Sequence, residues 1–170
     1  MTVFVALLRA VNVGGTGMLP MKELRDLCAE LGLQDVRTYI QSGNVVFESR
    51  LAEQALMQTL EPAVSAKLGK PAGVVIRTAA ELRSALDANP FPSAKPAQVG
   101  VVFLPQSPPH GVLTGLPIPG REELRLIGRE IFIHYPDGLG RSKLKLPAGA
   151  ASGTTRNLNT VARLVAMAEA

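Results

Sequence analysis

The stretch VFVALLRAV, residues 3–11, is a nearly continuous apolar run close to the start of the chain. A run of this kind is typical of a strand that is covered on both faces. A loop with three glycines in residues 14–17 follows it, and glycines so closely spaced indicate a connection rather than a regular element. The next apolar residues recur at helical spacing: Leu24, Leu27, Cys28 and Leu31. These segments predict a central strand that is joined by a loop to an amphipathic helix.

Residues 36–77 extend this pattern into a predicted sheet. Residues 36–41 alternate as a strand does, a tight turn falls around Gly43, and a return strand starts at Val45. Residues 51–68 predict a helix that Pro62 should kink or divide, and a further strand follows at residues 74–76. The order predicts a ferredoxin-like βαββαβ first half. We expect a four-stranded antiparallel sheet with two helices on one face and with the first and third strands central.

The second half predicts a smaller α/β part with a hairpin and a terminal helix. A helix over residues 79–88, a strand over residues 99–104 and a proline-rich loop lead to the hairpin around Gly128-Arg129. A short basic segment, residues 138–147, predicts one or two helical turns, and Thr154 or Thr155 can cap the last helix. The fold class is therefore α+β. We expect a ferredoxin-like subdomain over residues 1–78 and a C-terminal α+β subdomain over residues 79–170, packed as one unit.

Composition limits the class of protein. The chain has 170 residues, 46% of them hydrophobic and 4% aromatic, which is enough to build a core without disulfides and excludes a disordered chain. The only cysteine, Cys28, excludes an internal disulfide and a multi-cysteine zinc site. No start typical of a secretory signal is present, and no apolar segment reaches the ~18 residues of a membrane span. We expect a cytoplasmic protein with no metal, no cofactor and no membrane partner.

Two loops contain residue types that hold small ligands. The first follows the apolar strand and contributes Asn12, Gly14 and Gly15, with Arg9 at the end of the strand. Backbone N–H groups in such a loop can cradle an anion, although a glycine-rich connector that needs positive φ angles would have the same composition. The second loop is the tip of the predicted hairpin. It contributes Gln41, Ser42 and Asn44 as further candidate ligand residues. Small polar residues are also common in tight turns, so a purely structural turn accounts for them equally.

A third cluster precedes the last helix, within residues 152–159. It contributes Thr155, Arg156 and Asn157. At a helix N-terminus, free N–H groups and the macrodipole favour an anion, so an arginine there suggests a negatively charged ligand; ordinary capping is the alternative. We expect the Arg156 side chain to point away from the core and to share a cleft with residues 12–15. Residues 139–168 contain five basic and no acidic residues, which fits either phosphate attraction or a solvated surface.

Three ordered motifs resemble a known bacterial family. They are LRAVNVGG (residues 8–15), RTYIQSGNV (residues 37–45) and TTRNLNTV (residues 154–161), and together they are similar to the domain of unknown function 1697. The resemblance implies one α+β unit with a ferredoxin-like first half, and it implies no activity. The family commonly has an aromatic residue where this chain has Leu158, so any stacking contact from that position is absent here.

Several functions remain open. The amides and glycines at loop tips favour binding of a small anionic ligand, such as a nucleotide or a phosphorylated metabolite. An RNA-binding module that uses the open face of the sheet is an alternative, but the predicted sheet offers few aromatics for base stacking. Phe4 and Phe47 fall in strands whose pattern predicts burial. A non-catalytic protein-interaction domain is a further alternative. The sequence decides neither catalysis nor oligomeric state.

Overall fold

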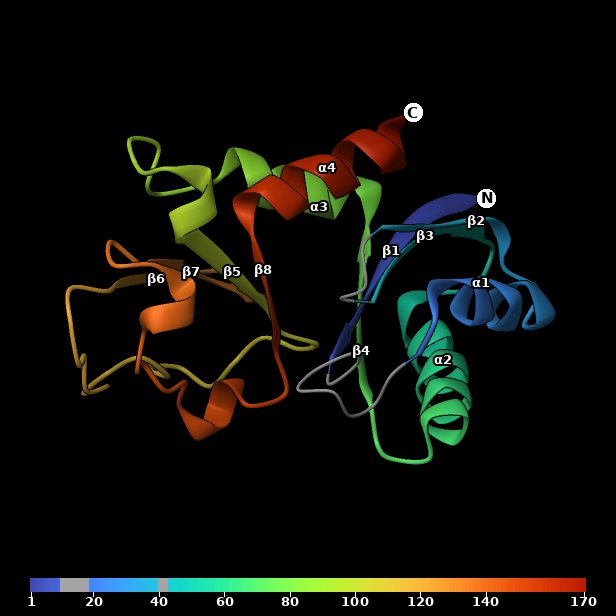
Figure 1. The fold of residues 1–170 in the computed structure, drawn as a ribbon, viewed down its shortest axis with the longest axis horizontal. Helices are drawn as coiled ribbons and strands as arrows, with labels where there is room; N and C mark the ends of the chain where they lie inside the picture. Colours follow the sequence, from blue (N-terminus) through green and yellow to red (C-terminus); the bar gives the residue numbers. More distant parts are fainter. Residues whose placement is uncertain (10–18, 40–42) are drawn as a thin grey trace. The chain divides into compact units, whose positions relative to one another are not determined.

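The computed structural model describes residues 1–9, 19–39 and 43–170 (Figure 1). The chain forms two compact units. The first unit comprises Met1–Leu82 and Leu164–Ala170, and the second comprises Arg83–Arg163. The end of the last helix thus groups with the N-terminal sheet, whereas the sequence suggested a division at a single point in the chain.

The first unit contains a four-stranded sheet and two helices, in the predicted order strand, helix, strand, strand, helix, strand. The elements are β1 (Thr2–Arg9), α1 (Met21–Glu30), β2 (Gln34–Tyr39), β3 (Asn44–Ser49), α2 (Glu53–Leu68) and β4 (Gly73–Thr78). The strand order is β2-β3-β1-β4, and all neighbours are antiparallel. The predicted antiparallel sheet with central first and third strands is confirmed.

Both helices cover one face of this sheet (Figure 1). Alternate strand residues, among them Phe4, Phe47 and Ile76, pack in a single cluster with apolar side chains of α1 and α2. The intervening residues of β1, Val5 and Leu7, are also fully buried. Burial on both faces explains why residues 3–8 form a continuous apolar run rather than an alternating one.

Helix α2 is one continuous element, so the expectation that Pro62 would divide it is wrong. Proline removes one backbone hydrogen bond from a helix interior. Pro62 is exposed, whereas Leu60 and Val64 are buried against the sheet. The packing of the apolar face keeps the helix intact across the proline.

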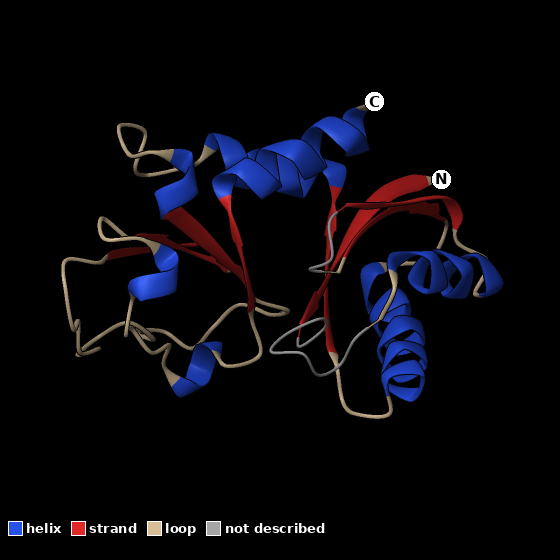
Figure 2. Ribbon diagram, viewed as in Figure 1, coloured by secondary structure: helices blue, strands red, loops and turns tan. Residues whose placement is uncertain are grey.

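The second unit contains an antiparallel sheet of order β6-β7-β5-β8 (Figure 2). Its strands are β5 (Val99–Phe103), β6 (Glu123–Ile127), β7 (Glu130–His134) and β8 (Thr154–Asn157). The predicted hairpin is present, with Gly128 at φ 61° in its turn. Helices α3 (Ala79–Asp87) and α4 (Leu158–Glu169) each have residues in both units. Both halves mix helices with antiparallel sheet, so the α+β fold class is confirmed.

The region before α4 differs from the prediction. Residues 154–157 form strand β8, which pairs with β5, and the helix begins only at Leu158. The expectation that Thr154 or Thr155 caps the helix is therefore wrong. Threonine favours extended backbone because its branched Cβ packs well in a sheet. The pairing partner is distant in sequence, so it left no local sign.

Candidate functional site

Arg9 lies at the end of β1 and is exposed. Its register partner on β4 is Gly73. A Cβ atom built on Gly73 would lie 2.8 Å from Nε and 3.0 Å from Nη2 of Arg9, so the guanidinium lies directly over the glycine. It makes no hydrogen bond or ion pair with any residue in the described ranges. The result is an exposed cation at one end of the first sheet, with no hydrogen-bond acceptor among the residues that the structure describes.

Asn44 lies on the same face of the sheet as Arg9. It pairs with Leu7, two residues before Arg9, and side chains two residues apart share a strand face. Asn44 is fully buried, and its Nδ2 donates to the Tyr39 carbonyl at 2.9 Å. Next to it, Gly43 has φ 81°, which confirms the predicted turn. Asn44 therefore ties the start of β3 to the end of β2.

Five of the predicted ligand residues lie outside the described residues: Asn12, Gly14, Gly15, Gln41 and Ser42. Their roles stay predictions. The cleft expected between residues 12–15 and Arg156 also stays a prediction, because the loop is not among the residues that the structure describes.

Arg156 does not open a helix. It lies in β8 opposite Val101 and is only 8% exposed, so the expectation that its side chain points away from the core is wrong. Its Nη1 donates to Thr154 Oγ1 at 2.8 Å and to the Thr155 carbonyl at 3.0 Å. Burial lowers the pKa of Arg156 to about 10, which leaves the side chain charged at neutral pH. Strand alternation turns Thr154 and Arg156 to the same buried side.

Asn157 and Thr155 also have structural contacts. The Asn157 Oδ1 accepts a hydrogen bond from the Thr160 N–H at 2.9 Å, so Asn157 caps the N-terminus of α4. The capping alternative is thus confirmed, with a residue other than the two expected. A Cβ built on Gly100 would lie 3.2 Å from Thr155 Cγ2, which places the Thr155 methyl group against the backbone of β5.

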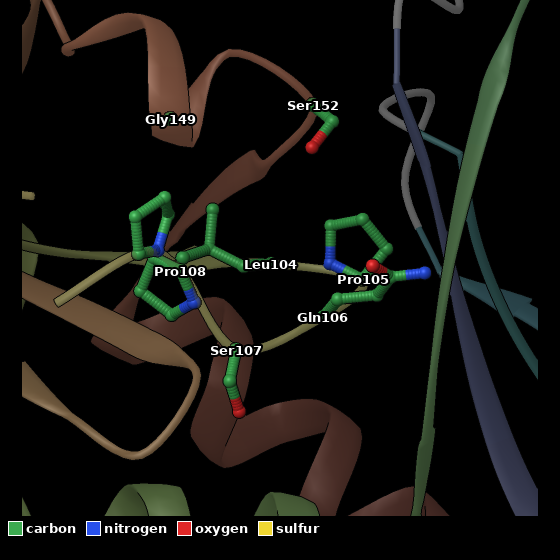
Figure 3. A pocket seen from close by; sticks show the side chains of 8 residues that line it. Leu104, Pro105, Gln106, Ser107, Pro108, Gly149 and Ser152 are labelled. Atoms are coloured by element: carbon green, nitrogen blue, oxygen red, sulfur yellow. The ribbon is translucent and has the colours of Figure 1, made fainter.

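A cavity of about 610 Å³ in the second unit was not expected (Figure 3). It is lined by Leu104, Pro105, Gln106, Ser107, Pro108, Pro109, Gly149 and Ser152. Ser152 belongs to the predicted cluster before α4 and Leu104 ends the predicted strand over residues 99–104, whereas residues 105–109 come from the proline-rich loop. The lining offers hydroxyl and amide groups and no charged side chain. It is therefore suited to a neutral polar group rather than to the predicted anion.

Phe4 and Phe47 of the first sheet face its helices, whereas Tyr39, the partner of Asn44 at the end of β2, lies on the other face of the sheet and is half-buried. Phe4 and Phe47 are register partners, their ring centroids lie 5.9 Å apart, and both are buried in the core. Base stacking on a sheet needs aromatic rings on the open face. The burial predicted for Phe4 and Phe47 is confirmed, so neither of these two rings is available to stack on a base.

Neither a metal site nor a nucleophilic cysteine finds support among the residues that the structure describes. No group of three or more His, Cys, Asp or Glu side chains there has the arrangement to hold a metal ion. Cys28 is buried in the first core, and burial raises the pKa of its thiol to about 12. A neutral thiol is a poor nucleophile and a poor ligand.

A family model described as "Protein of unknown function (DUF1697)" matches residues 1–132. The chain belongs to this family. The match includes the first two motifs of the DUF1697 resemblance, whereas the third motif, TTRNLNTV, lies beyond the matched residues. No curated protein matches the chain. Family membership therefore confirms the resemblance and assigns no activity.

A solved structure has the same fold as this DUF1697 chain. It is a conserved bacterial protein, SP0830 from Streptococcus pneumoniae, with 24% sequence identity and a TM-score of 0.81. The alignment covers 100% of this chain and 99% of that chain. Among the described residues, no helix combines the length and apolarity of a membrane span. The cytoplasmic location stays a prediction.

Proposed function

We propose that the protein binds a small anionic ligand, such as a nucleotide or a phosphorylated metabolite, at the end of β1. The observation that carries this proposal is the exposed guanidinium of Arg9 over Gly73, with no partner among the described residues. The planar fork of arginine favours two parallel hydrogen bonds to a phosphate or carboxylate. Gly73 has no side chain, so the guanidinium of Arg9 can lie against the backbone of β4 there.

The sequence next to Arg9 supports the same location. Asn12, Gly14 and Gly15 follow Arg9 within a few residues, and Gln41 and Ser42 come shortly before Asn44. Amides and glycine N–H groups are suitable partners for the remaining oxygens of an anion. In this proposal the loop residues select the ligand and Arg9 supplies the charge. The proposal assigns no reaction.

The residues before α4 have another role in this proposal. Arg156 and Asn157 contact neighbouring residues of β8 and the start of α4. These contacts stabilise the second unit whether or not a ligand is bound. The proposed site therefore consists of Arg9 with the two neighbouring loops.

Isothermal titration calorimetry with a panel of nucleotides and sugar phosphates tests this function. Loss of a charged, two-pronged hydrogen bond costs roughly 1.5–3 kcal/mol, so Arg9→Ala should weaken binding by about tenfold or more. Arg9→Lys keeps the charge without the fork and should recover only part of the affinity. Arg50→Ala is the matched control, because Arg50 is also exposed and forms no hydrogen bond or ion pair with a residue in the described ranges.

Two results would overturn the proposal. One is that no member of the panel binds to the unmodified protein, which would favour the non-catalytic interaction module. The other is that Arg9→Ala and Arg50→Ala bind the ligand equally well.

A further inference from the structure

A row of positive charge runs along the second unit. Within residues 141–146, three exposed cations alternate with other residues: Arg141, Lys143 and Lys145. The intervening Leu144 and Leu146 pack against the core cluster that contains Val102 and Ile133. Arg141 ends a 3₁₀ helix over Leu139–Arg141, and residues 142–146 after it are amphipathic, with the apolar side chains inward and the charges outward. We call Arg141, Lys143 and Lys145 the basic row.

Hydrogen bonds hold the segment at its start. Ser142 Oγ donates to Glu122 Oε1 at 2.8 Å, and the Leu144 N–H donates to Ser142 Oγ at 3.1 Å. The backbone of Ser142 is extended, with φ −71° and ψ 138°. Two residues of extended chain span about 7 Å. Lys143 and Lys145 therefore follow an anchored residue, Ser142, and Arg141 lies directly before it at the end of the 3₁₀ helix.

The neighbouring carboxylates are bound to other groups. Glu122 accepts hydrogen bonds from Ser142 Oγ and from the Gly120 N–H. Asp137 pairs with the guanidinium of Arg121. None of the three cations in the basic row forms a salt bridge with a residue that the structure describes. The pKa of Asp137 is lowered mainly by Arg121 and also by the charge of Arg141. The charges of Lys143 and Lys145 are therefore the ones most available to a partner outside this chain.

We propose that the basic row binds the phosphate backbone of single-stranded nucleic acid. An extended backbone would place residues 143 and 145 about 7 Å apart, which is comparable to the separation of successive phosphates along an extended strand. Residues 141–146, RSKLKL, include no aromatic side chain, so this segment offers no ring for base stacking. Contacts to phosphates alone carry no sequence information. Binding should therefore be independent of base sequence, and it does not rest on the ligand site at Arg9.

Salt dependence gives this proposal a quantitative form. Each phosphate that a cation neutralises contributes about −0.7 to the slope of log K against log salt for a single strand. Three contacts predict a slope of about −2, and affinity should fall roughly 20-fold between 50 and 200 mM salt. A modest affinity is expected, because only three charges take part.

Fluorescence anisotropy with a labelled 20-nucleotide thymidine strand tests the basic row. In the double variant Lys143→Ala/Lys145→Ala, the slope should change from about −2 to about −0.7, and affinity at low salt should fall about tenfold. The control double variant Lys67→Ala/Lys95→Ala removes the same charge from two other exposed lysines. It should bind as the unmodified protein does. Arg9→Ala should also leave this binding unchanged, which separates this proposal from the ligand site at Arg9.

Three results would overturn the proposal. The control variant could lose as much affinity as the basic-row variant, which would indicate a diffuse effect of net charge. The slope could stay the same in both variants. A polyglutamate peptide could bind at least as tightly as the oligonucleotide at equal salt, which would assign the row to an acidic protein segment. Circular dichroism melting curves establish that each variant is folded.

Discussion

Arg156 carries a positive charge into the interior of the second unit. Arg77 does the same in the first unit, where it is 1% exposed. Each guanidinium donates to the carbonyl of the preceding residue: Arg77 to Ile76 and Arg156 to Thr155. A buried charge is tolerated only when its donors are satisfied. Both arginines are therefore expected to stabilise the fold through hydrogen bonds and packing.

Replacing Arg156 with alanine should destabilise the protein by about 1–3 kcal/mol. The variant leaves Thr154 Oγ1 and the Thr155 carbonyl without these donors and opens a void. Arg156→Met retains most of the volume and should recover part of the loss. Urea unfolding monitored by circular dichroism measures both variants. An unchanged midpoint for Arg156→Ala would contradict the prediction.

The pH dependence of stability provides a second readout for this residue. Burial lowers the pKa of Arg156 to about 10, well below its ordinary value. Between pH 5 and 9 the side chain is protonated in both the folded and the unfolded state, so proton binding does not differ there. Above pH 10 this residue stays protonated in the unfolded state but loses its proton in the folded state, because its pKa is lower when it is buried. The free energy of unfolding should therefore rise with pH in this range. The loss in Arg156→Ala should therefore be constant from pH 5 to 9.

At the scale of elements, the start of α4 depends on one side chain. Asn157→Ala removes the acceptor for the Thr160 N–H and should cost about 1 kcal/mol. Asn157→Asp keeps an acceptor and adds a negative charge at the helix N-terminus, so it should be neutral or slightly stabilising. Asn159→Ala is the control, because Asn159 is exposed and within the same turn. Thermal melting compares the three variants, and equal losses for Asn157→Ala and Asn159→Ala would refute the capping role.

At the scale of the whole molecule, the end of the chain belongs to the first unit. Arg37 on β2 donates through Nη1 to the Met167 carbonyl at 2.6 Å, in the last turn of α4, where a cation is favourable to the helix dipole. Leu164 and Val165 are fully buried. The last helix therefore contributes to the stability of a unit that is encoded mainly by residues 1–82.

Truncation tests this assignment. Removal of residues 164–170 should destabilise the protein by roughly 2–5 kcal/mol, because it deletes buried side chains and the acceptor for Arg37. Removal of residues 169–170 alone deletes only exposed residues and is the control. Urea unfolding measures both proteins. Equal stability of the two truncated proteins would show that the C-terminal segment contributes nothing to the fold.

Local spacing of apolar residues was enough to predict most helices and strands of this protein, with β8 as an exception. The run at residues 3–8 predicts a strand covered on both faces, and the hairpin around Gly128 is visible in its flanking β-favouring residues. These features follow from the sequence because burial of a strand or helix face requires apolar residues at a fixed period. The alternation in RSKLKL at residues 141–146 is a signal of the same kind, and it points to the basic row.

Tertiary structure alone decided the roles of the charged residues. Strand β8 exists because β5 pairs with it, so the same four residues that resemble a helix cap are extended, and Arg156 is buried. Likewise, the guanidinium of Arg9 meets Gly73 only through the pairing of β1 with β4. Composition shows which side chains can bind an anion. Pairing between distant segments decides which of them are buried and which stay exposed to bind one, because solvent exposure depends on contacts that no local pattern records.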